Sequence, residues 1–325
     1  MRPSHSNAVW SVILAGGEGE RTRPFIQQWL GCSKPKQYCT FVGNRSMLQH
    51  TLDRADRVGM PHHKVTVIAE HHLPYVRETF DEQHQGQVIL QPRNCGTAAG
   101  IFLPLTYVRA RDPNATVVIY PSDHFVFPED RFAETVRRAT RAIDVLQDRV
   151  LLLGVRPTHL ELDYGWVNVG SILGRQGNSC LRQVDSFLEK PSHLEALQAM
   201  SNGGLWNTLV MVAKIDTLWS FGWQYLPVIM ERFERLGNSM NTVDEQQTLH
   251  QLYRHMPCMD FSSDLLQQAP ERLGVIELEE VLWSDWGRPE RIRETLEVLG
   301  KTPAFPSEIL TTPAAFSTSS LEVIS

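Results

Sequence analysis

The sequence predicts an α/β fold built on a doubly wound, mixed and mainly parallel sheet. Short runs of β-branched and aliphatic residues alternate with longer amphipathic segments through the first half of the chain. Such alternation favours parallel strands joined by right-handed crossovers through helices. The first run, residues 9–14, also ends in a glycine-rich loop, and ligands bind beyond the carboxyl ends of strands in sheets of this kind.

The strands are expected where short apolar runs are bounded by turn residues. Five such runs cover residues 9–14, 64–69, 87–90, 115–120 and 150–155. A later strand is expected to start near residue 274 and to end near Trp283. Strands that are buried on both faces carry few polar positions, and these runs fit that pattern.

The helices are expected where apolar residues recur at steps of three and four. These segments cover residues 47–58, 71–83, 96–112, 129–148, 215–236 and 243–253. Ser46 is expected to cap the first of them and Gly59 to follow its carboxyl end. We expect one domain over residues 1–300, with halves at about 9–155 and 156–300, and a flexible Ser/Thr/Pro-rich tail over 301–325.

The composition excludes several classes of protein. The 325 residues are 42% hydrophobic, enough for a sizeable core, and carry a formal net charge of -6, which argues against a nucleic-acid partner. No apolar stretch is long enough to cross a bilayer, and the first apolar run leads into Gly-Gly-Glu rather than a signal-peptide cleavage site. The five scattered cysteines form no C-x-x-C pair, so we expect no disulfide framework and a cytoplasmic location.

The loop after the first strand has the composition of an anion site. Gly16, Gly17 and Gly19 allow backbone N–H groups to approach an anion closely, and Arg21 and Lys36 add positive charge. The loop is neither a Walker A motif nor a dinucleotide fingerprint, because the required spacing fails in both cases. A surface turn rich in glycine and arginine would explain the loop equally well when it is considered alone.

The motif G-G-x-G-x-R followed by P-K-Q at residues 35–37 resembles the opening of the sugar-1-phosphate nucleotidylyltransferase family, most closely its mannose-1-phosphate guanylyltransferase branch. Glu20 and Thr22 depart from the residues usual there, which are Thr and Leu. The resemblance implies a Rossmann-like nucleotidyltransferase fold, whose first half binds the nucleotide and whose second half binds the sugar. The matching segments occur in the family's order over most of residues 9–293.

A second segment, residues 91–101, resembles the stretch of this branch that lies against the nucleotide base. Cys95 and Gly96 depart from its usual Arg and Asn, and a capped buried helix with a small-residue start would also explain it. The resemblance implies these nucleotide-binding residues: Leu14, Ala15, Gly16, Gly17, Gly19, Pro92, Asn94, Thr97 and Ala98.

Two aspartates are the expected metal ligands. Asp123 follows the run 115–120 and would lie in the crevice where ligands bind, although an Asp after a strand is often only a turn residue. It resembles the family's P-[AS]-D-H, and Asp285 resembles the Asp of W-x-D-[VW]-G; the resemblance implies that both hold Mg²⁺. The implied catalytic residues are Arg21, Lys36 and Asp123.

The second half carries three segments that resemble the family's sugar side: Y-G-W at 164–166, F-L-E-K-P at 187–191 and W-N-T at 206–208. The resemblance implies these sugar-phosphate-binding residues: Gly165, Glu189, Lys190 and Asn207. A strand bulge at Gly165 and an exposed strand end at residues 189–191 are the structural alternatives.

The implied reaction joins a nucleoside triphosphate, with GTP favoured, to a hexose 1-phosphate, with mannose 1-phosphate favoured, and releases pyrophosphate. Two alternatives stay open: a uridylyl- or thymidylyltransferase acting on glucose 1-phosphate, and an inactive regulatory subunit that binds nucleotide sugars. RNA binding by the basic helix 129–148 is a weaker third. We expect no nucleic-acid or membrane partner, and a homodimer is left open.

Overall fold

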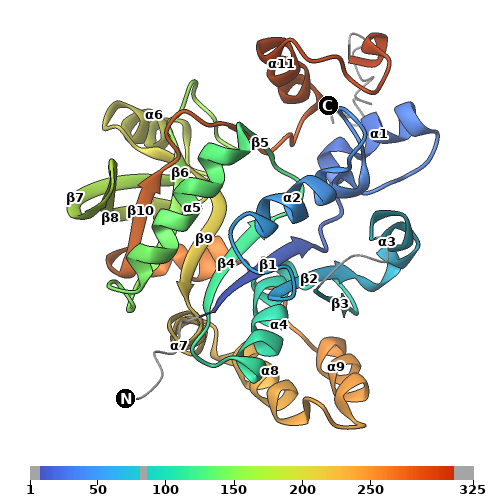
Figure 1. Ribbon diagram of the computed structural model, residues 1–325, viewed down its shortest axis with the longest axis vertical. Helices are drawn as coiled ribbons and strands as arrows, with labels where there is room; N and C mark the ends of the chain where they lie inside the picture. The colour runs from blue at the N-terminus through green and yellow to red at the C-terminus, as the bar shows by residue number, and fades with distance from the viewer. Residues whose placement is uncertain (1–7, 81–85, 311–325) are drawn as a thin grey trace, which may run out of the picture.

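The computed structural model describes residues 8–80 and 86–310. Its centre is a nine-stranded sheet with the order β3-β2-β1-β4-β9-β6-β10-β8-β7 (Figure 1). The strands are β1 Val9–Ala15, β2 Lys64–Ala69, β3 Gln87–Gln91, β4 Thr116–Pro121, β6 Val150–Val155, β7 Trp166–Gln176, β8 Ser179–Leu188, β9 Leu205–Lys214 and β10 Leu273–Glu277. A separate antiparallel pair joins β5 Phe125–Phe127 to β11 Leu282–Ser284.

The direction of the strands confirms a mixed, mainly parallel sheet. Strand β1 pairs in parallel with β2 and β4, β2 with β3, and β6 with β10. Strand β9 runs antiparallel to β4 and β6 between them, and β8 runs antiparallel to β10 and β7. Only β8 and β9 therefore oppose the common direction of this sheet, and the loops after β1, β2 and β4 leave from one edge.

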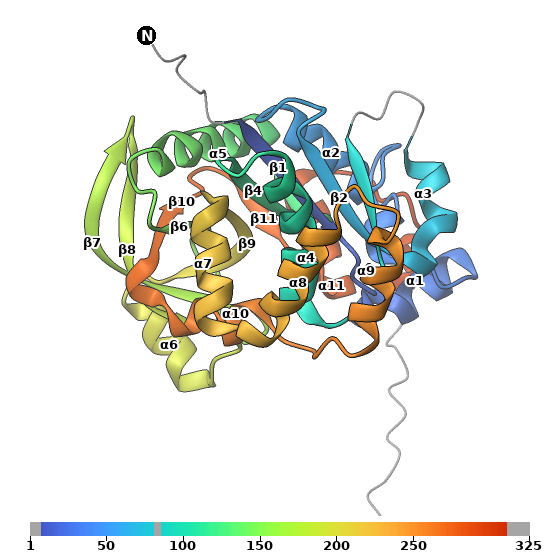
Figure 2. The same ribbon diagram turned by 90° about the horizontal axis from the view of Figure 1, so that it is seen from below.

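Helices cover both faces of the sheet (Figure 2). Their bounds are α1 Arg23–Leu30, α2 Met47–Asp56, α3 Leu73–Thr79, α4 Gly96–Arg111, α5 Glu129–Ile143, α6 His193–Ser201, α7 Ile215–Tyr225, α8 Pro227–Ser239, α9 Glu245–Arg254, α10 Phe261–Asp264 and α11 Pro289–Leu299. Helices α4, α7, α8 and α9 pack on one face, whereas α2, α5 and α6 pack on the other.

The alternation of side chains along each strand feeds two separate cores. On β1, Val12 points into the core under α4 and the next residue, Ile13, into the core under α2 and α5. On β4, Val117 and Val118 divide in the same way. All four side chains are fully buried, which explains why these strands read as continuous apolar runs.

Several expected boundaries need correction. The segment 215–236 is two helices, because Pro227 starts α8 and cannot continue the hydrogen bonding of α7. The segment 71–83 starts with a 3₁₀ turn, Glu70–His72, before α3, and residues 81–85 lie outside the described part of the chain. Helix α5 ends at residue 143 rather than 148, and the strand expected over 274–283 is divided into β10 and β11.

A third apolar cluster joins the two ends of the described chain. It contains Phe25 of α1, Ile292 of α11, and three aromatic residues outside the helices, Phe41, Trp286 and Phe305, of which Phe305 is 4% exposed. The backbone N–H of Ala304 donates to the carbonyl of Phe41 at 2.8 Å. The packed part of the chain therefore extends beyond residue 300, where the tail was expected to begin, and residues 311–325 lie outside the described range. No helix in the described part of the chain has the length and apolarity needed to cross a membrane.

Candidate active site

The glycine loop and Asp123 meet because β1 and β4 are parallel neighbours. The loop follows Ala15 at the end of β1, and the backbone N–H of Ser122 donates to the carbonyl of Leu14 at 3.1 Å. Gln37 fixes the position of the loop, because its side-chain amide donates to the carbonyls of Ala15 and Gly17, each at 2.9 Å. The P-K-Q segment thus positions the loop as well as carrying Lys36.

Lys36 lies at the centre of the charged residues. Its side chain is buried, and Nζ is 2.8 Å from Asp123 Oδ2 while it also donates to the backbone carbonyl of Asp285. Burial alone would raise the pKa of the Asp123 carboxyl, but the Lys36 ammonium outweighs this and lowers that pKa below its ordinary value. Asp123 is therefore ionised at neutral pH and paired with a fixed cation.

Asp285 accepts hydrogen bonds on both oxygens. Oδ1 accepts from Arg291 at 2.7 Å, from the Tyr164 hydroxyl at 2.9 Å and from the backbone N–H of Gly287 at 2.8 Å, whereas Oδ2 accepts from Arg21 at 3.2 Å. Burial acts to raise the pKa of Asp285, but the charges of Lys36 and Arg291 dominate and hold that pKa well below its ordinary value. The Asp285 carboxylate therefore links α11, Tyr164 and Arg21 through hydrogen bonds.

Gly287 allows the close approach of Arg21 to Asp285. A Cβ atom at position 287 would lie 2.5 Å from Asp285 Oδ2 and 2.8 Å from Arg21 Nη2, both closer than real Cβ contacts. The glycine of the W-S-D-W-G segment is thus needed where two charged side chains meet.

Further charged residues, which the sequence analysis did not predict, surround Asp285. Arg291 also donates to Glu161, and Asp163 pairs with Arg21 at 3.2 Å and with Arg288. Arg291 could have been found: it shares the buried stripe of α11 with apolar residues, and a buried arginine requires a carboxylate partner. Glu161 and Asp163 lie in a loop with no periodic pattern, so their contacts with the arginines could not be predicted from the local sequence.

The two aspartates fit a hard divalent cation. Mg²⁺ takes oxygen ligands, and both carboxylates are ionised at neutral pH. Asp285 uses Oδ1 for its three buried donors, which leaves Oδ2 with Arg21 alone among the described hydrogen-bond partners. Asp123 Oδ1 is 3.7 Å from His124 Nε2 and accepts no hydrogen bond from a described residue. Each carboxylate therefore has one oxygen outside the buried network.

Three of the predicted sugar-side residues come together: Asn207 lies in β9, Gly165 directly precedes β7 and Glu189 directly follows β8. The backbone N–H of Asn207 donates to the carbonyl of Gly165 at 2.8 Å, and a Cβ at Gly165 would lie 3.1 Å from Glu189 Oε2. Burial raises the pKa of Glu189, and the nearby charge of Asp260 adds to this. Lys190 is exposed and has a positive φ of 46°, which turns the chain out of β8.

The segment that is predicted to bind the nucleotide base, residues 91–101, is called the base segment here. It packs against residues 259–261. Thr97 Oγ1 donates to Asp260 Oδ2 at 2.9 Å and accepts from the backbone N–H of Phe261 at 2.7 Å. Ala98 N–H donates to the carbonyl of Met259, and Asn94 Oδ1 accepts from the N–H of Gly96. The Thr97 hydroxyl and the Asn94 side-chain oxygen therefore already have partners within the protein. Pro92 lies at the start of this segment, half-buried.

The start of the glycine loop reaches the base segment. A Cβ at Gly16 would lie 3.3 Å from Gln91 Oε1, and one at Gly19 would lie 3.1 Å from Lys36 Cβ. Gly17 has open space beside it, with no atom within 4 Å of where its Cβ would be. The structure thus brings the loop, Lys36, both aspartates and the base segment to one edge of the sheet.

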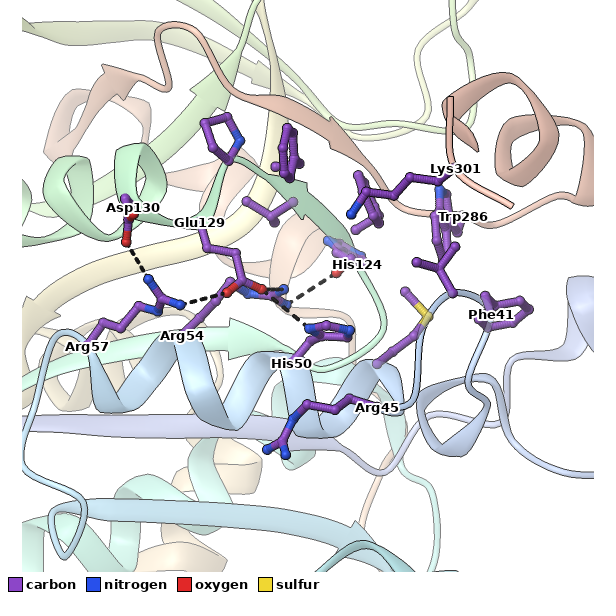
Figure 3. A pocket seen from close by; sticks show the side chains of 16 residues that line it. Phe41, Arg45, His50, Arg54, Arg57, His124, Glu129, Asp130, Trp286 and Lys301 are labelled. Atoms are coloured by element: carbon purple, nitrogen blue, oxygen red, sulfur yellow. Dashed lines mark hydrogen bonds and ion pairs between the residues drawn. The ribbon is translucent and has the colours of Figure 1, made fainter. Parts of the chain in front are cut away.

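An apolar cavity of about 320 Å³ lies beside this site and contains none of the predicted residues (Figure 3). Figure 3 shows His50, Arg54 and Arg57 converging on Glu129 along one wall. Arg54 donates to the backbone carbonyl of His124 at 3.3 Å. Arg54 therefore supports the residue that follows Asp123, and the cavity is not lined by Arg21, Lys36, Asp123 or Asp285.

Comparison with known proteins gives consistent similarities. A family model described as nucleotidyl transferase matches residues 10–301. A mannose-1-phosphate guanylyltransferase of Salmonella montevideo is 28% identical over 214 residues, which cover 64% of this chain and 43% of that protein. A protein of the same name from Klebsiella pneumoniae is 25% identical over 280 residues, covering 85% of this chain and 57% of that protein. The matches thus span only about half the length of these relatives.

The fold has a solved counterpart. A crystal structure from Thermus thermophilus, described as a mannose-1-phosphate geranyltransferase, superposes with a TM-score of 0.73 at 24% identity. The superposition covers 88% of this chain and 79% of that one. At this identity the likeness establishes the shared architecture of sheet and helices.

Proposed function

The chain belongs to the nucleotidyl transferase family, and from this premise we propose that it transfers a nucleotidyl group from GTP to mannose 1-phosphate. The observation that carries the proposal is the convergence of four charged residues beside the glycine loop: Arg21, Lys36, Asp123 and Asp285. A site that must bind several phosphate groups and a cation needs this combination of fixed charges.

The proposed chemistry is direct displacement at the α-phosphorus of the triphosphate. A phosphate oxygen of the sugar 1-phosphate forms the new P–O bond, the bond between the α-phosphorus and the bridging oxygen breaks, and pyrophosphate leaves. The attacking oxygen is already ionised at neutral pH, so no side chain has to remove a proton. Catalysis then depends on positioning and on neutralising charge.

The charged residues divide the work on the nucleotide side. Arg21, whose side chain is half exposed, and the amides of the loop after Ala15 would bind the leaving β- and γ-phosphates. Lys36 is fixed by Asp123 and by the carbonyl of Asp285, so its ammonium would stay beside the α-phosphate without reorganisation. Asp123 and Asp285 would hold Mg²⁺, which supplies positive charge to the phosphate oxygens.

The second half of the chain would bind the sugar. Glu189 and Asn207 supply hydrogen-bonding groups next to the buried Gly165, where a side chain would be only 3.1 Å from Glu189 Oε2. Lys190 is exposed and makes no ion pair with a described residue, so it is available for the sugar phosphate. The choice of guanine and mannose is supported by relatives named for that activity at 25% to 28% identity.

Pyrophosphate release measures the proposed function directly. The purified full chain is incubated with Mg²⁺ and a matrix of nucleoside triphosphates and hexose 1-phosphates. We expect the highest rate with GTP and mannose 1-phosphate. A maximum with UTP or dTTP and glucose 1-phosphate would overturn the choice of base and sugar while retaining the chemistry. No release from any pair, together with measurable binding of a nucleotide sugar, would identify a regulatory subunit instead.

A further inference from the structure

A second group of metal-binding side chains lies beside the glycine loop. Glu18, in the loop after β1, faces His71 and His72, which lie in the 3₁₀ turn after β2. One ligand atom from each of these residues lies within 4.8 Å of the other two. Since β1 and β2 are parallel neighbours, the fold itself brings these two loops together at the ligand-binding edge.

The spacing of the three side chains fits tetrahedral coordination. Glu18 Oε1 is 2.9 Å from His71 Nε2 and 3.7 Å from His72 Nε2. Ligands about 2.0 to 2.1 Å from a tetrahedral ion lie about 3.3 Å from each other, midway between these distances. The ligand atoms of His71 and His72 lie within 4.8 Å of each other, so rotation of the side chains would be needed to place all three atoms around one centre.

His72 is the observation that points to a ligand. Its side chain is 0% exposed, and neither Nδ1 nor Nε2 makes a hydrogen bond of ordinary length and angle; the Ala15 backbone and the Glu18 carboxylate, whose Oε1 is 3.7 Å from Nε2, are only weak partners. A buried imidazole that is so weakly paired is costly, because its polar atoms have lost water without a full replacement.

The two oxygens of Glu18 face different partners. Oε2 is 3.6 Å from Arg23 Nη2, whereas Oε1 faces both histidines and is 2.9 Å from His71 Nε2. The carboxylate could therefore keep its contact with Arg23 and bind a cation through Oε1 in place of the direct contact with His71.

We propose that Glu18, His71 and His72 form a second metal site that takes a transition-metal ion such as Zn²⁺. Two imidazoles and one carboxylate suit Zn²⁺, whereas Mg²⁺ prefers ligand sets made only of oxygen. Three protein ligands leave the fourth tetrahedral position open to water or to an anion. The ion joins the glycine loop to the turn after β2 and adds positive charge beside the loop.

Zinc binding to the metal-free full chain tests this site. We expect one Zn²⁺ per chain by calorimetry in the presence of excess Mg²⁺, which keeps sites made of carboxylates occupied. His71 is 59% exposed, so His71→Ala should fold normally, and we expect it to weaken Zn²⁺ binding by at least about 10-fold, as should Glu18→Gln. Thermal unfolding of the metal-free variants checks their folding.

A matched control comes from a second histidine pair. His62 is exposed and adjoins His63, but no carboxylate completes a metal-binding group there among the described residues. His62→Ala should leave Zn²⁺ affinity unchanged. Co²⁺ in place of Zn²⁺ should give the absorption of a nitrogen and oxygen site, without the thiolate bands that the exposed Cys32 or Cys258 would produce. Absence of Zn²⁺ binding, or equal affinity in His71→Ala and the unmodified chain, would overturn the proposal.

Discussion

Asp285 shows how one side chain can support both the structure and the proposed chemistry. Its carboxylate joins Arg21 of the loop region, Tyr164 of the second half and Arg291 of α11. A buried charge with several donors costs little while all of them are present, but removal of the charge leaves those donors unpaired. Residue 285 should therefore affect stability as well as turnover.

The pH dependence of stability tests this role. Because the folded pKa of Asp285 is lowered, its contribution is present above the ordinary carboxylate pKa and is lost as the pH falls toward the folded value. We expect the free energy of unfolding to stay level from neutral pH to about pH 4 and then to decrease. In Asp285→Asn the whole curve should be lower and its acid slope smaller, as measured by urea unfolding.

Asp130→Asn is the control for this measurement, because the Asp130 side chain is 88% exposed. It should change the free energy of unfolding by no more than about 0.5 kcal/mol. An Asp285→Asn protein with the acid slope of the unmodified chain would show that the carboxylate is not held in its charged form.

At the residue scale, local sequence predicted the side chains that sit in motifs. Lys36 and Asp123 each follow a recognisable strand or loop, and the structure places them 2.8 Å apart. The partners of Asp285 were not predictable in this way, because Tyr164 is 121 positions away and no local pattern links the two. The roles of all these residues in binding and catalysis stay predictions.

At the scale of elements, the docking of the base segment on residues 259–261 determines which residues can start α4. Gly96 has a φ of 83°, and a Cβ there would lie 2.2 Å from the carbonyl oxygen of Met259. Gly96, which stands where the mannose-1-phosphate guanylyltransferase branch usually has Asn, thus has a physical reason in this chain. Any other residue at position 96 would have to adopt a positive φ, and its side chain would push the base segment away from residues 259–261.

Gly96→Ala should therefore destabilise the protein. Strain at positive φ costs about 1 to 2 kcal/mol and the forced contact about 1 to 3 kcal/mol more, so we expect a loss of about 2 to 5 kcal/mol in urea unfolding. Gly100→Ala, in the same helix, is the opposite control, since its Cβ would meet only Gln91 Oε1 at 3.7 Å. It should be neutral or stabilising by about 0.5 to 1 kcal/mol, and equal losses in both variants would contradict the account.

Element boundaries were predictable where the stop signal is local. Ser46 caps α2 as expected, through a capping box with Gln49, and β2 and β6 have the predicted bounds. The insertion of β9 between β4 and β6 was not predictable, because strand order depends on contacts between distant segments. The same holds for the pairing of β11 with β5, which places Asp285 near Asp123.

At the scale of the whole molecule, the third apolar cluster ties residues 301–310 to α1 and to the site. Phe305 packs edge-on against Phe25 with ring centroids 5.1 Å apart, and Phe41 lies between this group and Trp286. Trp286 follows Asp285 directly and stacks on Phe125. The end of the described chain therefore supports the segment that carries the second aspartate.

Phe305→Ala should reveal this support. Loss of a buried aromatic ring costs about 3 to 5 kcal/mol, and we expect this decrease in the free energy of unfolding. Val298→Ala, on the exposed face of α11, should change stability by less than about 0.5 kcal/mol. If Phe305→Ala is as stable as Val298→Ala, residues 301–310 do not belong to the folded body.

The turnover of Asp123→Asn tests the central claim most directly. Asp123 contacts fewer groups than Asp285, but it pairs with the buried Lys36 ammonium at 2.8 Å, so the thermal unfolding of the variant is measured together with its turnover. With GTP, mannose 1-phosphate and Mg²⁺, we predict that pyrophosphate release by the folded variant falls by about 10²- to 10³-fold, or about 3 to 4 kcal/mol. Near-normal release by Asp123→Asn would contradict the claim that this charged centre carries nucleotidyl transfer.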